Sequence, residues 1–583
     1  MSFVKSFFAC LCAILVSALI IFLVLFGIGA AMIYSSTSPA TVSSNSILYI
    51  PLEGSMEERT QEDIYAKLLS NAELSPSLES ILSSVKAAKT DDRIKGIYLK
   101  PGVLSCGYAS LEEIRKALLD FKTSGKFIYA YSGTYTQGAY YVSSVADSVF
   151  INPQGVLDFR GVASSSMFYK HLLDTVGVDM QVIKVGTYKS FTEQYTNDSM
   201  SAPNREQTEH LIHSLWNSVR KDISDSRSIS EDSLNEIANQ MMAFQTPQVA
   251  LEYKMVDVIC YADEIKSLLK TKLSLKDNDK VPFVSVTDYF SSQEIEKTVA
   301  SVSPKKVAVL YMVGEIDNGN KDGISSSKMV SQLNNLRSDS TIKAVVLRVN
   351  SPGGSAYGAE QIWRAVTLLK EKKPVVVSMG DYAASGGYYL SAGANYIYAD
   401  SKTITGSIGV FGVIPNVNKL MNKLGVKHEV VKTNPYADLL SNFTRPLDET
   451  ETAVLQTHVA EVYDTFLTRC SEGRNMEKSE VEKIAEGRVW SGVDAKNIGL
   501  VDRLGTLKDA ISYAAKLSEL GDDYAVVSYP ELKSALEQLS ELPHLGYEKM
   551  FHSEILSREM EILNKIERLD FNQAIMPYSI SVK

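Results

Sequence analysis

The stretches RIKGIYLK at residues 93–100 and TIKAVVLR at residues 341–348 coincide when the sequence is shifted by 248 residues. The same shift places residues 92–196 over residues 340–444 without a gap. Both stretches are short and mainly apolar, and amphipathic stretches of helical period follow them. Continuous apolar strands between helices are typical of a largely parallel sheet covered on both faces. The sequence therefore predicts two tandem α/β repeats.

The two copies differ at polar positions that matter for chemistry. Ser385 in the second copy lies opposite Gln137 in the first, and Lys189 in the first copy lies opposite Ala437 in the second. One copy thus keeps a possible nucleophile and the other keeps a possible base. This is the pattern expected of a duplicated enzyme that divides one Ser-Lys site between its copies.

Length and composition set further bounds. At 583 residues the chain is too long for a single core, and 45% hydrophobic with 22% charged residues is a globular composition. The net charge of −10 gives no electrostatic footprint for nucleic acid, so we expect no nucleic-acid partner. The five cysteines form no C-x-x-C pair, which favours free thiols over disulfides or a zinc site. We expect no metal and no cofactor.

The N-terminal segment carries no charged residue from Phe7 to Tyr34. As a helix rising about 1.5 Å per residue it exceeds the roughly 30 Å hydrocarbon core of a bilayer. It is also longer than the apolar region of a cleavable signal peptide, which favours an uncleaved signal anchor; cleavage after the small residues near Ala30 or Ala40 is the alternative. Lys5 is the only upstream positive charge, so the N-terminus is predicted to stay cytoplasmic and the rest to be exported.

The remaining chain divides at changes in pattern. Apolar strands at 46–52 and 306–312 are expected to open the two repeats, and residues 285–304 to join them. In the second repeat we expect a strand at 344–349, a helix at 359–370 and a strand at 374–378. The predicted division is a signal anchor or transmembrane helix at 1–40, a first repeat at 41–295, a second repeat at 303–530 and a helical C-terminal extension at 531–583.

Three pieces of sequence fit acyl-transfer chemistry. The first is VNSPGGS at residues 349–355, between a predicted strand and a predicted helix. Two consecutive glycines there let the backbone approach a ligand and aim N–H groups at a developing oxyanion, although many such pairs are simple turns. The matching first-copy segment, VLSC at residues 103–106, lacks the glycines. A single oxyanion site is therefore expected.

The other two pieces are Ser385 and Lys189. Ser385 precedes Gly386 and Gly387, where a serine either caps a helix or presents its hydroxyl beside the first helical amides. It is not the G-x-S-x-G elbow, because Ala383 occupies the first glycine position. Lys189 is either a solvent-facing lysine or, if burial lowers its pKa, a general base.

Histidine offers no better base. The seven histidines lie outside the glycine-rich segments. His210 and His213 form an H-x-x-H pair, but no carboxylate-rich frame surrounds them, so we interpret them as surface or packed helix residues.

Four motifs in order carry a family resemblance. They are GTYKS at 186–190, LRVNSPGGS at 347–355, AASGGY at 383–388 and TGSIGVFGV at 405–413. Over roughly residues 45–530 the chain resembles the long, duplicated form of the signal peptide peptidase A (protease IV) family, peptidase family S49. The resemblance implies a ClpP/crotonase-like fold in each repeat and a Ser-Lys dyad. It makes Ser385 the nucleophile, Lys189 the general base, and the backbone N–H groups of Gly354 and Gly386 the oxyanion hole.

The same resemblance implies a biological setting. It describes a serine endopeptidase anchored in the bacterial cytoplasmic membrane by one N-terminal helix, with its catalytic part on the extracytoplasmic, periplasmic side. It implies a homotetramer whose sites face an enclosed bowl. The expected substrates are signal peptides and other hydrophobic peptides in or at the lipid bilayer.

Two other functions are compatible with parts of the sequence. A crotonase-type acyl-CoA enzyme uses the same fold and a similar Gly-Gly oxyanion hole without a serine nucleophile, but export and the Ser-Lys division argue against it. A non-catalytic membrane scaffold or chaperone on a decayed protease is the second. Covalent labelling of Ser385 separates the protease from both. Whether Ser385 and Lys189 meet within one chain or across subunits is open at this point.

Overall fold

The computed structural model describes residues 42–59, 75–300, 305–317, 323–532 and 573–575, together with residues 7, 16, 17 and 20. Apart from those four positions, the predicted signal anchor at 1–40 lies outside the described residues. Within the described ranges, no helix is both long enough and apolar enough to cross a membrane. The predicted helical extension after residue 530 also lies mostly outside them, and its described part includes a short strand, β18 (Gln573–Ile575).

The first repeat is built on a six-stranded sheet in the order β6-β4-β3-β2-β1-β7, and its strand pairs are parallel. In chain order its elements are β1 (Ser46–Ser55), α3 (Leu78–Thr90), β2 (Ile94–Ser105), α4 (Tyr108–Lys122), β3 (Phe127–Tyr135), α5 (Gln137–Ser143), β4 (Ser148–Leu157), α6 (Lys170–Val176), β5 (Asp179–Val185), α7 (Glu193–Thr196), α8 (Ala202–Arg227), α9 (Glu231–Ala238), α10 (Pro247–Glu252), β6 (Val258–Ile259), α11 (Ala262–Lys272), β7 (Phe283–Ser285) and α12 (Val286–Ala300). The last helix occupies most of the predicted joining segment.

The second repeat repeats this plan around a sheet whose main path is β15-β13-β11-β9-β8-β17, with β12 joining β11 to β16. Its elements are β8 (Lys306–Val313), α13 (Ser326–Ser338), β9 (Ile342–Ser351), β10 (Gly353–Ser355), α14 (Ala356–Lys370), β11 (Val375–Ala384), α15 (Gly386–Ala392), β12 (Tyr396–Ala399), β13 (Ile404–Gly406), β14 (Val410–Asn416), α16 (Asn418–Lys423), α17 (Glu449–Arg474), α18 (Lys478–Ile484), β15 (Val489–Ser491), α19 (Gly492–Asn497), β16 (Arg503–Leu504), α20 (Leu507–Leu517) and β17 (Ala525–Tyr529).

The internal repeat is confirmed element by element. Helices α3 and α4 begin and end 248 residues before α13 and α14, which is the shift that aligns the sequence. The predicted opening strands are present as β1 and β8. The predicted strand at 374–378 is longer than expected, because β11 continues to Ala384 and ends next to Ser385.

Strand β9 shows why these runs form buried parallel strands. Its side chains alternate between two faces, so Leu347 packs in the same apolar cluster as Ile362 of α14, whereas Val346 packs with Ala514 of α20. All four side chains are fully buried. Each large apolar side chain of this kind contributes about 1.5–3 kcal/mol on burial. A strand covered on both faces needs apolar residues at every position, which is the pattern in the sequence.

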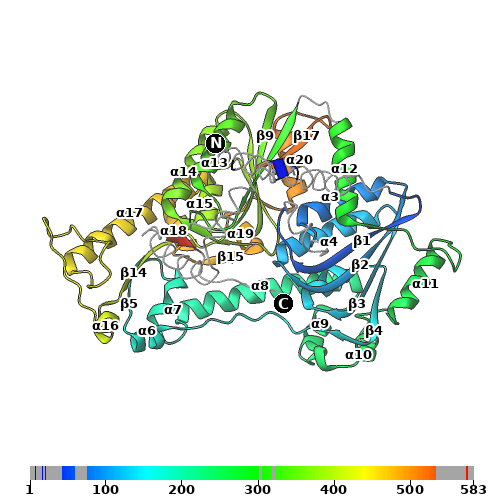
Figure 1. Cartoon of the computed structure of the whole chain (residues 1–583), viewed down its shortest axis with the longest axis horizontal. Helices are drawn as coiled ribbons and strands as arrows, with labels where there is room; N and C mark the ends of the chain where they lie inside the picture. Colours follow the sequence, from blue (N-terminus) through cyan, green and yellow to red (C-terminus); the bar gives the residue numbers. More distant parts are fainter. Residues whose placement is uncertain are drawn as a thin grey trace.

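The two repeats are joined by a third, four-stranded sheet in the order β10-β18-β14-β5. Strand β5 of the first repeat pairs antiparallel with β14 of the second from Val185 opposite Val410 to Asp179 opposite Asn416. In Figure 1, β5 and β14 lie side by side at the far end of the molecule from β1–β4, and the long helix α8 spans the distance between the two lobes. The first repeat thus sends one strand into the second.

A buried ionic contact also joins the repeats. The Arg348 guanidinium on β9 lies 2.9 Å from a Glu58 carboxylate oxygen and 2.5 Å from one of Glu113, and the side chains are essentially buried. Lys402 of the second repeat pairs in the same way with Glu112 and Asp222 of the first. Buried charges of this kind are tolerated because each has an opposite partner.

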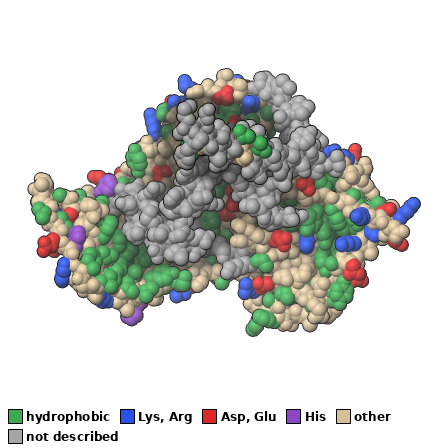
Figure 2. Space-filling view, viewed as in Figure 1, with side chains coloured by type: hydrophobic (Ala, Val, Ile, Leu, Met, Phe, Trp, Pro, Cys, Tyr) green, Lys and Arg blue, Asp and Glu red, His purple; other side chains and the backbone are tan. Residues whose placement is uncertain are grey.

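Exposed apolar side chains gather at the end of the molecule built from α6, β14 and α16. Figure 2 shows this region as a broad green area at the lower left. Leu172 and Leu424 there are 59% and 69% exposed, and Val176 and Val426 are also exposed. Large contiguous apolar surfaces are typical of interaction sites.

Candidate active site

The structure brings Lys189 and Ser385 together within one chain. The Lys189 Nζ atom lies 2.7 Å from the Ser385 Oγ atom, although the residues are 196 positions apart. Both residues have no solvent-exposed surface. The question left open by the sequence, whether the two meet within a chain or between subunits, is thus answered for this structure.

Ser385 occupies a constrained turn between β11 and α15. Its backbone has φ of 55° and ψ of −116°, a conformation that a non-glycine residue adopts only when its surroundings enforce it. Its N–H donates to the carbonyl of Gly406 at 2.8 Å, which fixes the turn to strand β13. Although Ser385 is the first residue before α15, its side chain makes no capping hydrogen bond. The hydroxyl faces Lys189 instead of serving the helix.

Lys189 is carried to this turn by the β5–β14 ladder. Just after β5, the Tyr188 N–H donates to the Glu486 carbonyl at 2.8 Å, which ties the segment to the second repeat. The Gln207 side chain on α8 donates to the Tyr188 carbonyl at 2.9 Å and accepts from the Val489 N–H. The lysine backbone is therefore held on both sides before its side chain reaches into the core.

The fit around Lys189 depends on a glycine. A Cβ atom added at Gly487 would lie 2.6 Å from the Lys189 Cβ and 2.6 Å from its backbone nitrogen, well inside contact distance. Gly487 also has φ of +82°, which favours glycine. This close approach buries the lysine, and burial lowers the pKa of Lys189 well below its usual value of 10.5, because desolvation disfavours the ammonium.

Ser407 completes the surroundings of the amine. The Lys189 Nζ atom lies 3.0 Å from both the carbonyl oxygen and the hydroxyl oxygen of Ser407. A neutral amine has two N–H donors and one lone pair. With both donors directed to Ser407, the lone pair is left for the Ser385 hydroxyl. The sequence analysis did not single out Ser407, although it falls in the TGSIGVFGV motif; nothing in the sequence marked Gly487.

Gly354 and Gly386 lie where backbone N–H groups can serve the site. Gly386 is the first residue of α15, and the first amides of a helix have no intrahelical acceptor. Gly354 is on β10, where the neighbouring Gly353 carbonyl and Ser355 N–H both pair with Ile316. In an extended strand the N–H and C=O of Gly354 therefore face the opposite side. A Cβ at Gly354 would meet the Ile316 carbonyl oxygen at 2.3 Å, so a side chain does not fit here.

The corresponding position in the first repeat is filled. Gln137, at the position of Ser385, donates to the Tyr108 hydroxyl at 2.7 Å and accepts from the N–H of Gly161 at 2.8 Å. It also accepts from the Arg160 N–H. Ala437, the counterpart of Lys189, is exposed. The described residues thus assemble one Ser-Lys pair, not two.

The histidines do not compete for the role of base. His210 lies 3.2 Å from Asp494 on the surface, and His213 is exposed as well. No cluster of three or more metal-ligating side chains occurs among the described residues.

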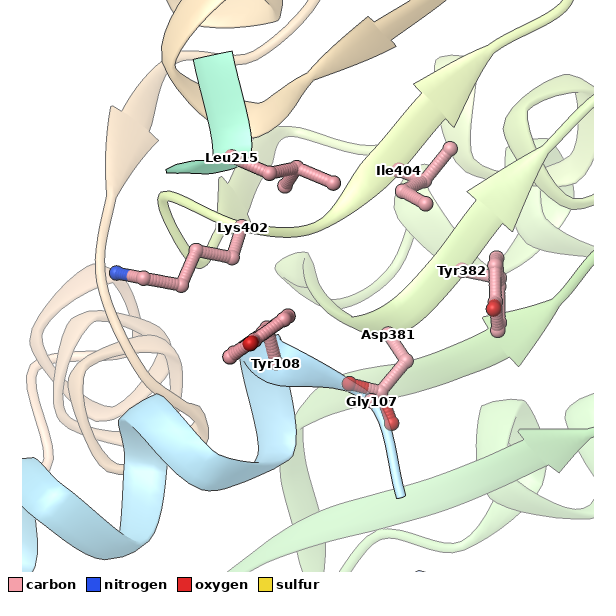
Figure 3. Close-up of a pocket in the computed structure, with 7 residues that line it drawn as sticks. All are labelled: Gly107, Tyr108, Leu215, Asp381, Tyr382, Lys402 and Ile404. Carbon is pink, nitrogen blue, oxygen red and sulfur yellow. The ribbon is translucent and has the colours of Figure 1, made fainter. Parts of the chain in front are cut away.

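A small pocket elsewhere belongs to the contact between the repeats. Figure 3 shows its lining residues, with Asp381 directed toward Gly107 at the start of α4. The Asp381 carboxylate accepts from the Ser110 N–H at 2.9 Å and from its hydroxyl at 2.6 Å. It therefore caps a helix of the other repeat, and neither Ser385 nor Lys189 lines this pocket.

Comparison with known proteins assigns this arrangement. The model of peptidase family S49 matches the chain twice, at residues 120–276 and 367–521, one match in each repeat. The chain belongs to peptidase family S49. A Clp protease family model also matches residues 306–401. The S49 chain therefore consists of two tandem ClpP-like α/β repeats, and it is a serine-type protease by family.

Relatives cover most of the S49 chain. It is 35% identical to Protease 4 of Salmonella typhi over 519 residues, which are 86% of this chain and 83% of that protein. It is 34% identical to Protease 4 of Haemophilus influenzae (84% and 82% covered). It is 30% identical to the chloroplastic serine protease SPPA of Arabidopsis thaliana (82% and 70% covered). A solved structure, a point mutant of ClpP1 from Listeria monocytogenes, matches 37% of this chain and 99% of its own at 15% identity, with a TM-score of 0.25.

Proposed function

We propose that this S49 protease is a membrane-anchored serine endopeptidase that uses a Ser385–Lys189 dyad to degrade cleaved signal peptides and other hydrophobic peptides. The observation that carries the proposal is the 2.7 Å approach of Lys189 Nζ to Ser385 Oγ inside a fully buried site. A serine hydroxyl is a weak nucleophile until a base takes its proton. A lysine whose pKa is lowered by burial is such a base near neutral pH.

In the proposed mechanism the neutral Lys189 amine accepts the Ser385 hydroxyl proton as Oγ attacks the scissile carbonyl carbon. The N–H groups of Gly354 and Gly386 donate to the oxyanion that forms, which is the largest contribution in many acyl-transfer sites. The Lys189 ammonium then returns the proton to the leaving amine, and the peptide bond breaks to give an ester on Ser385. Lys189 next takes a proton from water, which attacks the ester and releases the acid.

The membrane setting and the substrates rest on other features. The uncharged run from Phe7 to Tyr34 supports an N-terminal anchor in the bacterial cytoplasmic membrane, with the catalytic repeats on the periplasmic side. An anchored enzyme meets hydrophobic leader peptides at the bilayer where they remain after export. The exposed apolar surface around Leu172 and Leu424 supports assembly into a homotetramer.

A non-catalytic scaffold is the competing function, and a peptidase assay decides between the two. The full chain in detergent micelles is incubated with a hydrophobic leader peptide, and products are followed by mass spectrometry. Ser385→Ala and Lys189→Ala should be inactive while keeping a cooperative melting transition, and Lys189→Arg should be inactive because a guanidinium stays protonated. Lys184→Ala, on the same segment but outside the dyad, is the matched control and should cleave normally.

Two outcomes would remove the proposal. Turnover by folded Ser385→Ala at the wild-type rate would exclude the serine as nucleophile. An inactive wild type that also fails to form a covalent adduct at Ser385 with a serine-reactive phosphonate would favour the scaffold.

A further inference from the structure

The described part of the C-terminal extension lies at the candidate active site. Strand β18 pairs antiparallel with β10, with Gly353 opposite Ile575, Gly354 opposite Ala574 and Ser355 opposite Gln573. On its other side, Gln573 pairs antiparallel with Phe411 of β14. The strand therefore fills the space between β10 and β14 and completes the four-stranded sheet.

This position faces the backbone groups assigned to the oxyanion. Because Ile316 uses the Gly353 carbonyl and the Ser355 N–H on one side of β10, the Gly354 N–H and C=O face β18 on the other. Ala574 lies directly opposite Gly354. The tail backbone thus passes across the N–H group that would hold the oxyanion of a substrate.

Extended peptides bind to proteins by adding a strand to a sheet edge, with main-chain hydrogen bonds giving the affinity. The facing edges of β10 and β14 offer such a position between them, and β18 shows that a strand of this chain fits there. A peptide substrate needs the same position to bring its scissile carbonyl to Gly354 and Ser385. One strand position cannot hold both the tail and a substrate.

We propose that residues Gln573–Ile575 act as an internal pseudosubstrate, which occupies the substrate strand position and competes with peptides for the site. The inference rests on the proposed peptidase function and adds a regulatory device to it. A tail that competes with the substrate raises the apparent KM in proportion to its occupancy and leaves kcat unchanged. If the tail is seated about nine-tenths of the time, removing it lowers KM about tenfold.

The kinetic test compares tail variants of the full chain in detergent. A chain ending at Asn572 and the variant Ala574→Pro should both show a lower KM with kcat unchanged, since proline lacks the N–H that a strand pairing uses. Ser579→Pro, in the same tail but outside β18, is the matched control and should keep the wild-type KM. A KM that changes less than about twofold in both variants would overturn the proposal.

A binding test does not depend on turnover. A fluorescent peptide of residues 569–579 is titrated into the Ser385→Ala chain ending at Asn572, and its anisotropy is measured. Saturable binding that unlabelled leader peptide displaces supports the pseudosubstrate, whereas no binding, or binding equally well by the Ala574→Pro peptide, overturns it. An inactive wild type whose tail peptide still binds would refute the peptidase and leave the seated tail standing, so the two failures are distinguishable.

Discussion

Replacing Ser407 by alanine tests how the amine of Lys189 is held. The Ser407 hydroxyl oxygen lies 3.0 Å from Lys189 Nζ, and the Ser407 carbonyl oxygen lies at the same distance. Ser407→Ala removes the first contact and keeps the second, because the carbonyl belongs to the backbone. The amine is then held by one acceptor in place of two, and its lone pair is less well directed at the Ser385 hydroxyl.

The size of the effect follows from the bond that is lost. A side-chain hydrogen bond of this kind contributes about 0.5–1.5 kcal/mol. Since about 1.36 kcal/mol corresponds to a tenfold change in rate, kcat should fall about two- to tenfold. The pH profile should also move. Hydrogen bonds to a charged group are stronger than those to a neutral one, so Ser407 favours the ammonium, and its removal lowers the pKa of Lys189 further.

The assay is kcat measured against pH for the wild type and Ser407→Ala. The neutral amine is the active form, so activity rises as pH rises through the pKa of Lys189, and this rise should occur at lower pH in the variant. Ser143→Ala is the matched control: this buried first-repeat serine donates to the Ala139 carbonyl and lies away from the site. A variant with an unchanged kcat and an unchanged pH profile would refute the role of Ser407.

Three further predictions concern stability and fit. Because burial lowers the pKa of Lys189, the folded state binds fewer protons than the unfolded state between the folded pKa and 10.5, so stability rises with pH there; Lys189→Met should remove this dependence and raise the melting temperature at neutral pH in thermal scans. Arg348→Met leaves Glu58 and Glu113 buried without their partner and should cost about 3–5 kcal/mol in denaturant unfolding, whereas loss of under about 1 kcal/mol would contradict this pairing. Gly487→Ala should lower kcat by about 10²-fold with the dyad intact, since a displacement of about 1 Å is that costly; a normal kcat would show that the close approach is not needed.

Much of the fold followed from the sequence because its signals are local. The 248-residue shift and the apolar runs depend on neighbouring residues, and they located β9, α14 and β11 correctly. The Ser-Lys pair was also found, because complementary losses between aligned copies are visible without coordinates. The contact itself then depends on folding.

The features that escaped prediction are those created by distant pairing. Strand β5 resembles any short apolar run, and nothing in residues 179–185 shows that it pairs with β14 of the other repeat. Ser407 contacts Lys189 only because the strand before it ends beside the dyad. Strand β18 lies in a segment whose charged helical pattern dominates, and three residues are too few to carry a period of their own.

The division of the site between the repeats is difficult to reverse, and the structure shows why. Restoring a serine at Gln137 would leave the Gly161 N–H without its acceptor, and unsatisfied buried donors cost about 1–3 kcal/mol. The new hydroxyl would also lack a base, since the counterpart of Lys189 is exposed Ala437. No glycine pair stands at residues 103–106 to donate to an oxyanion. Three separate changes would be needed before any second site gained activity, so each repeat alone is expected to be inactive and the single site depends on both being joined through β5 and β14.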